Sequence, residues 1–110
     1  MNDIDINDST PNASWLSCVE EVKTLCSNYN ITLILATIPT TPTRNNNAKN
    51  SYIVQSGYRY VDQVSAMGAD NVGNWFAGYQ SSDGNHTTTQ GAKVLAFRYL
   101  SDVPELMYNV

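Results

Sequence analysis

The chain has 110 residues and a formal net charge of −4, with 42% hydrophobic and 15% charged residues. This composition is typical of a globular protein, and the length suits one domain over residues 1–110. The six lysine and arginine residues form no cluster, which argues against nucleic acid and anionic membrane surfaces as partners. No apolar run approaches the roughly 18 residues of a membrane-spanning helix, so membrane insertion is not expected.

The first expected element is an amphipathic helix at residues 13–28. It follows a helix start signal, Ser-Thr-Pro-Asn, at residues 9–12. Its apolar residues recur at helical spacing and should face the core: Trp15, Val19, Val22, Cys26 and Tyr29. Cys18 and Cys26 are too far apart along this helix, at roughly 12 Å, to form a disulfide. We therefore expect two buried thiols.

A buried strand is expected next, at residues 31–37. This run is apolar and rich in β-branched residues with little alternation, as in a parallel strand that is covered on both faces. The loop at residues 39–47 follows the carboxyl end of that strand and is rich in proline, threonine and asparagine. Open α/β sheets bind their ligands at this edge, so the loop is a candidate substrate rim.

The remaining pattern continues the alternation of helices and strands. It predicts a helix at residues 48–55, a strand at 58–61 and a helix at 89–100, which Pro104 closes. We expect the strands at 31–37 and 58–61 to be adjacent and parallel, because a helical crossover joins them. The expected fold class is therefore α/β, a flavodoxin-like three-layer αβα sandwich with a parallel sheet.

The only histidine of the chain, His86, follows Asp83 by three residues. In a turn, such positions can be neighbours, so the Asp83 carboxylate could accept a hydrogen bond from Nδ1 of His86 and leave Nε2 free to take a proton. From spacing alone, a capping or surface histidine is the alternative, because Asp and Gly are common in turns. Hydroxyl residues and then an apolar helical pattern follow, which places the pair just before a helix N-terminus.

Residues 81–92 read Ser-Ser-Asp-Gly-x-His-x-Thr-x-x-Gly-Ala, and this segment resembles the last block of the SGNH or GDSL hydrolase family. The resemblance implies that Asp83 and His86 are the catalytic acid and base. The family usually has proline directly after the histidine. This chain has Thr87 there, a residue that can cap the following helix instead.

The resemblance extends upstream of this block. Residues 31–39 are similar to the family's strand that ends in proline, and residues 57–62 to its final strand. Residues 1–4, Met-Asn-Asp-Ile, look like the tail of the family's G-x-N-D block without its glycine. This implies that Asn2 is the asparagine of the oxyanion hole. A polar residue in a frayed terminus is the alternative.

The sequence contains no recognisable nucleophile. Neither Gly-Asp-Ser nor Gly-x-Ser-x-Gly occurs, and the serines lie in helix, strand or turn contexts. The resemblance implies that the family's serine and glycine blocks would lie before Met1. We therefore expect the chain to be the C-terminal portion of an SGNH domain. Its open sheet edge at residues 31–37 favours self-association or a partner chain.

Aromatic residues precede the proposed base, in the loop at residues 73–82. Trp75 and Tyr79 could stack on a sugar ring or line an acyl pocket, because aromatic faces offer a large contact area. For Trp75, ordinary packing of the loop onto the sheet edge is the alternative. Asp62, at the end of its strand, is expected to bond local backbone N–H groups rather than to take part in chemistry.

The resemblance implies a serine ester hydrolase that acts on a small-molecule ester without a cofactor. The segment at residues 79–86 looks like that of bacterial members acting on acylated carbohydrates, which favours a carbohydrate O-acetyl esterase over a lipase. The alternative is a non-catalytic α/β fragment, or a subunit that packs onto another chain. A metal site is not expected, because one histidine without clustered cysteines or carboxylates cannot assemble a coordination shell.

Overall fold

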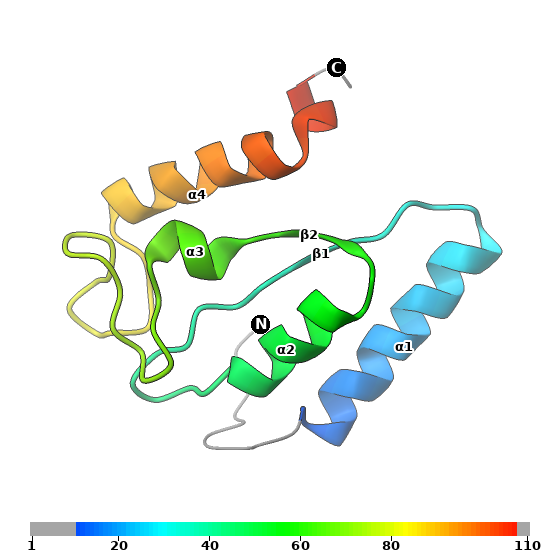
Figure 1. The fold of residues 1–110 in the computed structure, drawn as a ribbon, viewed down its shortest axis with the longest axis horizontal. Coiled ribbons are helices and arrows are strands. Elements are labelled where there is room, and N and C mark those ends of the chain that lie inside the picture. The colour runs from blue at the N-terminus through cyan, green and yellow to red at the C-terminus, as the bar shows by residue number, and fades with distance from the viewer. Residues whose placement is uncertain (1–10, 108–110) are drawn as a thin grey trace.

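The computed structural model describes residues 11–107, and Figure 1 shows how they are arranged. The helices are α1 (Ala13–Asn28), α2 (Asn47–Gln55), α3 (Gln63–Met67) and α4 (Thr89–Asp102), followed by a 3-10 turn, η1 (Pro104–Met107). The strands are β1 (Ile34–Ala36) and β2 (Arg59–Val61). Three of these helices were predicted at nearly the same positions. Within residues 11–107, none of the helices has the length and apolar character needed to cross a bilayer.

β1 and β2 are parallel neighbours, with Leu35 opposite Tyr60. This confirms the expected pairing, although both strands are shorter than the segments that predicted them. α2 lies between them in the chain and forms the crossover that a parallel pair needs. The two strands therefore end at the same edge, where the N–H of Thr37 donates to the carbonyl of Val61 at 3.0 Å.

The described residues do not form the expected three-layer sandwich. In Figure 1, α1 and α2 lie on one side of the strands and α3 and α4 on the other, but the sheet between them has two strands. Neighbouring strands are only about 4.8 Å apart, so such a narrow sheet cannot cover the apolar faces of these helices. The observed architecture is a mixed α/β slab whose shortest extent is 19 Å.

α1 begins after Asn12, whose side-chain oxygen accepts hydrogen bonds from the N–H groups of Ser14 at 2.8 Å and Trp15 at 3.3 Å. The ring of Trp15 packs edge-on against Tyr52 of α2. α1 lies outside α2 in Figure 1. Besides α2, the helix contacts the segment before β2, where the ammonium of Lys23 lies 5.4 Å from the ring centroid of Tyr58.

The expectation that the apolar stripe of α1 is core is wrong, because no residue of this helix is buried. Val22, which belongs to that stripe, is 44% exposed. The prediction of two buried thiols fails for the same reason, since Cys18 is exposed and Cys26 is half-buried. The buried apolar side chains lie closer to the strands: Ile53, Val61, Ala66, Met67 and Val103.

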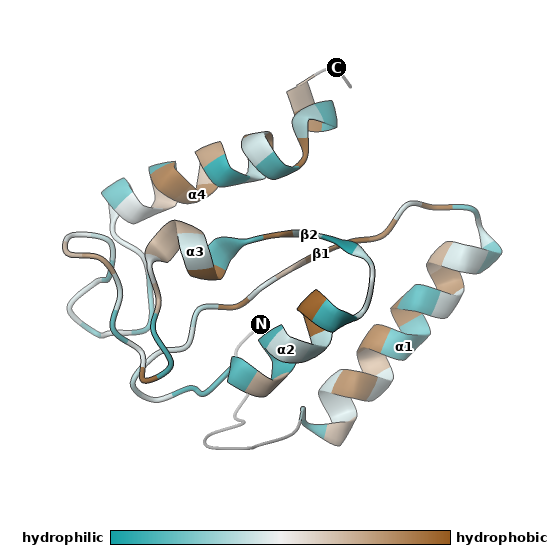
Figure 2. Cartoon of the chain, in the orientation of Figure 1, coloured by the Kyte–Doolittle hydropathy of each residue, from teal (hydrophilic) through white to brown (hydrophobic). Residues whose placement is uncertain are grey.

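Large apolar side chains remain at the surface on both sides of the slab. Phe97 of α4 is 73% exposed, and Ile31, which precedes β1, is 60% exposed. Figure 2 shows hydrophobic segments along both α1 and α4. The described part of the chain thus leaves apolar surface uncovered on more than one element.

The helix α3 was not predicted from the sequence. Asp62 caps its N-terminus by accepting a hydrogen bond from the N–H of Ser65 at 3.1 Å. Gly68 ends it in the left-handed conformation, with φ at 62°. An aspartate and a glycine at these positions are standard helix signals, and they would have marked α3. The expected local role of Asp62 is confirmed.

Candidate active site

Backbone hydrogen bonds close the turn that contains His86. The N–H of Ser81 donates to the carbonyl of His86 at 2.8 Å, and the N–H of Gly84 donates to the carbonyl of Ser81 at 3.0 Å. Gly84 has a φ of 77°, which glycine adopts without a steric penalty. α4 begins shortly after the turn, with the Thr88 hydroxyl as its cap. The turn is therefore fixed on one side by the bond between Ser81 and His86 and on the other by the start of α4.

This turn brings the side chains of Asp83 and His86 into contact. Nδ1 of His86 lies 2.6 Å from Oδ2 of Asp83. Nε2 makes no hydrogen bond within residues 11–107. Both side chains are accessible, with 69% of His86 and 52% of Asp83 exposed. An ionised Asp83 favours the Nδ1–H tautomer of the neutral ring, which leaves the Nε2 lone pair able to accept a proton.

The second carboxylate oxygen of Asp83 collects three further donors. Oδ1 accepts from the Ser81 hydroxyl at 2.6 Å, the Asn85 N–H at 2.7 Å and the His86 N–H at 3.1 Å. The Ser81 hydroxyl, followed by the Asn85 N–H and the His86 ring, holds the pKa of Asp83 well below its usual range. Asp83 therefore carries its negative charge beside the imidazole at neutral pH.

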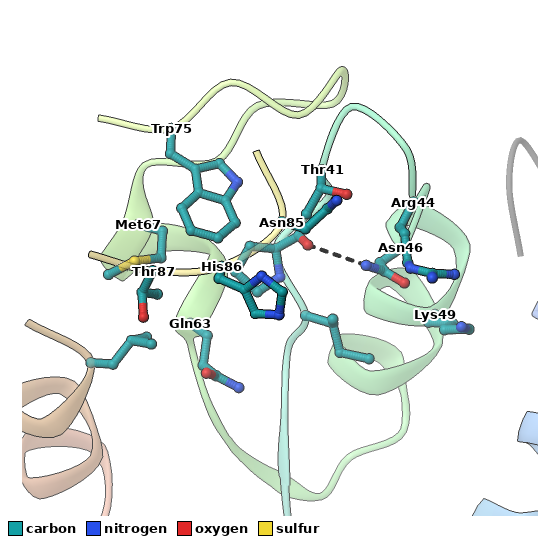
Figure 3. A pocket seen from close by; sticks show the side chains of 13 residues that line it. Thr41, Arg44, Asn46, Lys49, Gln63, Met67, Trp75, Asn85, His86 and Thr87 are labelled. Atoms are coloured by element: carbon teal, nitrogen blue, oxygen red, sulfur yellow. Dashed lines mark hydrogen bonds between the residues drawn. The ribbon is translucent and has the colours of Figure 1, made fainter. Parts of the chain in front are cut away.

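A cavity of about 250 Å³ lies beside His86. Figure 3 shows the ring of His86 among the side chains that line it, with Trp75 and Gln63 on opposite sides. The other lining residues include amides, a hydroxyl and apolar groups: Asn46, Asn85, Thr41, Ile38, Pro39, Met67 and Leu95. No serine is among the described residues that line this cavity. Residues 11–107 also contain no group of three or more His, Cys, Asp or Glu side chains that could hold a metal ion.

The comparisons with known proteins give no family for this chain. No protein-family model, curated protein or solved structure matches it. What the site can do therefore follows from its own residues.

The structure brings one of the two aromatic candidates to the cavity. Trp75 lines it, and its indole N–H donates to the carbonyl of Thr40 at 2.8 Å. Trp75 is thus anchored to its surroundings and still contributes to the cavity wall. Tyr79 is not among the lining residues, and its ring packs edge-on against Phe76 with 6.0 Å between centroids. Asn2 lies outside the described residues.

The loop after β1 forms part of the wall, as expected from its place at the carboxyl end of the strand. Thr41 and Arg44 exchange backbone hydrogen bonds of 2.9 and 3.2 Å, which close a tight turn. The Thr43 hydroxyl donates to Oδ1 of Asn85 at 2.7 Å and links this loop to the turn of His86. The Oγ1 atom of Thr41 is buried and has no hydrogen-bond partner.

Two polar residues of the site were not predicted from the sequence. Ser81 donates to Asp83, and a serine two residues before an aspartate in a turn is a recognisable signal for such a local bond. Asn46 is only 6% exposed, and its Nδ2 donates to the carbonyl of Pro39 at 3.1 Å. Three asparagines follow one another at this point of the chain, so no sequence signal distinguished Asn46 from Asn45 or Asn47.

Proposed function

We propose that this chain supplies the general base and its orienting acid to a serine ester hydrolase of the SGNH or GDSL type. The observation that carries the proposal is the 2.6 Å contact between Nδ1 of His86 and Oδ2 of Asp83 beside a cavity, with Nε2 free of hydrogen bonds to residues 11–107. An orienting carboxylate beside a histidine base is a recurrent means of activating a hydroxyl nucleophile for acyl transfer. The resemblance of residues 81–92 to the family's last block supports the same assignment.

In the proposed reaction, a serine hydroxyl attacks the carbonyl carbon of the ester while His86 takes its proton at Nε2. Asp83 stabilises the imidazolium that forms. The tetrahedral intermediate then collapses, the C–O bond to the alcohol breaks, and His86 gives its proton to the leaving oxygen. Water attacks the acyl-serine with His86 again as base, which releases the carboxylic acid and restores the serine. We assign the oxyanion contact to Asn2.

The proposal requires the serine to come from polypeptide other than the described lining residues. The exposed apolar surface supports this, because Phe97 on one side of the slab and Ile31 beside β1 are large side chains without cover. Within residues 11–107, no strand pairs with the outer edge of β1. We propose that further strands add to this edge and extend the slab to a flavodoxin-like three-layer sandwich.

We propose an acylated carbohydrate as the substrate. The wall of the cavity combines the indole of Trp75 with the side-chain amides of Asn46, Gln63 and Asn85. An aromatic face suits a sugar ring, and amides both donate to and accept from hydroxyl groups. A long acyl chain would instead favour a continuous apolar wall.

The test compares the chain alone with the chain joined to its natural upstream coding sequence, using a chromogenic acetyl ester. The chain alone should show only the background of an unassisted imidazole. The longer protein should hydrolyse the ester, and His86→Ala should abolish that activity, since loss of the histidine base of such a triad costs on the order of a millionfold in kcat. Activity of the short chain that survives His86→Ala would contradict the proposal.

A second candidate function, a non-catalytic subunit that packs onto another chain, is favoured by the same exposed Phe97 and Ile31. To discriminate between the two functions, the association state and the esterase activity of the longer protein are measured together. A longer protein that self-associates or binds a partner but has no esterase activity would favour the subunit. An active longer protein that loses activity in His86→Ala would favour the enzyme.

A further inference from the structure

We propose that Ser81 is a positioning residue, whose hydroxyl fixes the orientation of the Asp83 carboxylate so that Oδ2 faces Nδ1 of His86. This inference rests on the proposed function of the Asp83–His86 pair, and it gives a role to a residue to which the resemblance assigns none. Within residues 11–107, the Ser81 hydroxyl makes no hydrogen bond to the imidazole. The hydroxyl donates to Oδ1 of Asp83, and the other oxygen of that carboxylate contacts the ring.

The two oxygens of Asp83 have different partners. Oδ1 accepts three hydrogen bonds, from the Ser81 hydroxyl and the N–H groups of Asn85 and His86. Oδ2 accepts one, from Nδ1 of His86. The terminal torsion of an aspartate has broad minima, so contacts at Oδ1 decide how the carboxylate plane is turned. The donors at Oδ1 therefore orient the carboxylate so that Oδ2 faces the imidazole.

Ser81 is the only side-chain donor among the three. The other two belong to the backbone of the turn and remain in any variant that keeps the turn. The hydroxyl contact, at 2.6 Å, has the length of a charge-assisted O–H to carboxylate bond, the stronger class of such bonds. At 52% exposure, Asp83 is open to competing water, which makes a fixed donor more important for its orientation.

The backbone of Ser81 has a separate role, which is to close the turn. Removing the side-chain hydroxyl leaves that role unchanged. The N–H of Ser81 donates to the carbonyl of His86 at 2.8 Å, and the carbonyl of Ser81 accepts from Gly84 at 3.0 Å. Ser81→Ala keeps both bonds and removes only the hydroxyl. Ser82→Ala is a matched control, because Ser82 is exposed and its hydroxyl makes no hydrogen bond within the described residues.

The test measures the tautomer of His86 by long-range ¹H–¹⁵N NMR at about pH 8.5, where an imidazole is normally neutral. His86 is the only histidine, so its ring signals need no further assignment. The native chain should show the Nδ1–H tautomer. In Ser81→Ala the ratio of Nδ1–H to Nε2–H should fall by roughly two- to tenfold, which is less than the full effect of losing a charge-assisted bond because the two backbone donors at Oδ1 remain. Ser82→Ala should match the native chain, and Ser81→Thr should restore its ratio.

Two reference variants separate the possible failures. Ser81→Cys, which keeps the size of the side chain but is a weak donor, replaces Ser81→Ala if the backbone spectrum shows that the turn is lost. Asp83→Asn should change the tautomer ratio of His86 whether or not Ser81 orients residue 83, because the amide removes the acceptor charge. A native ratio in Ser81→Ala together with a changed ratio in Asp83→Asn overturns the role of Ser81 alone. A native ratio in both overturns the Asp83–His86 pair and the proposed function with it.

Discussion

Gly73 packs directly against the backbone of Thr41, so closely that a Cβ at Gly73 would lie 2.4 Å from the Thr41 carbonyl carbon. Gly73 also has a φ of 100°, which other residues rarely adopt. Gly73→Ala should therefore lower the free energy of unfolding by about 2–5 kcal/mol, combining overpacking with the cost of a left-handed backbone. Denaturant unfolding followed by circular dichroism measures this loss.

Gly57→Ala is the matched control for Gly73→Ala. Gly57 has a φ of 81°, but nothing lies within 4 Å of a Cβ placed there. This variant should lose only the conformational part, about 1–2 kcal/mol. Equal losses at both positions would show that the close approach to Thr41 has no energetic weight.

Replacing Thr40 by valine and replacing Thr41 by valine should change the free energy of unfolding in opposite directions. The Thr41 hydroxyl is buried without a partner, so Thr41→Val removes an unsatisfied group and should raise the free energy of unfolding by about 1 kcal/mol. The Thr40 hydroxyl donates to Asn47 at 2.8 Å and accepts from the N–H of Asn46 at 3.0 Å. Thr40→Val should therefore cost about 1–3 kcal/mol. Destabilisation of similar size in both variants would contradict the unpaired state of Thr41.

The contact between α1 and α2 should depend on pH through Lys23. Hydrogen bonds from its ammonium to the Tyr52 hydroxyl at 3.1 Å and to Glu20 at 3.0 Å raise the pKa of Lys23 to about 12. A pKa raised by folding stabilises the protein fully below the ordinary value of 10.5, and the contribution disappears as the pH rises through about 12. Tyr52→Phe should move the pKa of Lys23 back towards 10.5, which an NMR titration of the lysine side chains would detect. An unchanged pKa would mean that the Tyr52 hydroxyl is not its main cause.

Trp75 should affect the proposed reaction through substrate binding. In the longer protein of the proposed test, Trp75→Ala should raise KM for an acetylated sugar at least severalfold, because a stacking surface is lost, and should change kcat/KM for a small chromogenic ester much less. Tyr79→Ala is the comparison, since Tyr79 does not line the cavity. Equal effects on both esters would assign Trp75 to loop packing.

The sequence predicted the elements better than their burial. The Asn12 cap and the helical spacing placed α1, and the apolar runs placed two parallel strands. Neither pattern shows how much sheet is available to cover an apolar stripe, so Val22 and Cys18 were expected inside and lie at the surface. At the site, the spacing of Asp83 and His86 predicted a local contact. Asn46, which is far from His86 in the sequence, lines the same cavity only because of tertiary packing, so its place there was not predicted.

The Asp83–His86 contact spans three residues, whereas the bond from Thr43 to Asn85 spans 42 and that from Trp75 to Thr40 spans 35. Closing a long loop costs more conformational entropy than closing a short one, so the short turn depends less on distant parts of the chain than the wall of the cavity does. The wall of the cavity can therefore open while the acid–base pair stays assembled. Access to the site would then be governed by motions that leave the proton-transfer geometry intact.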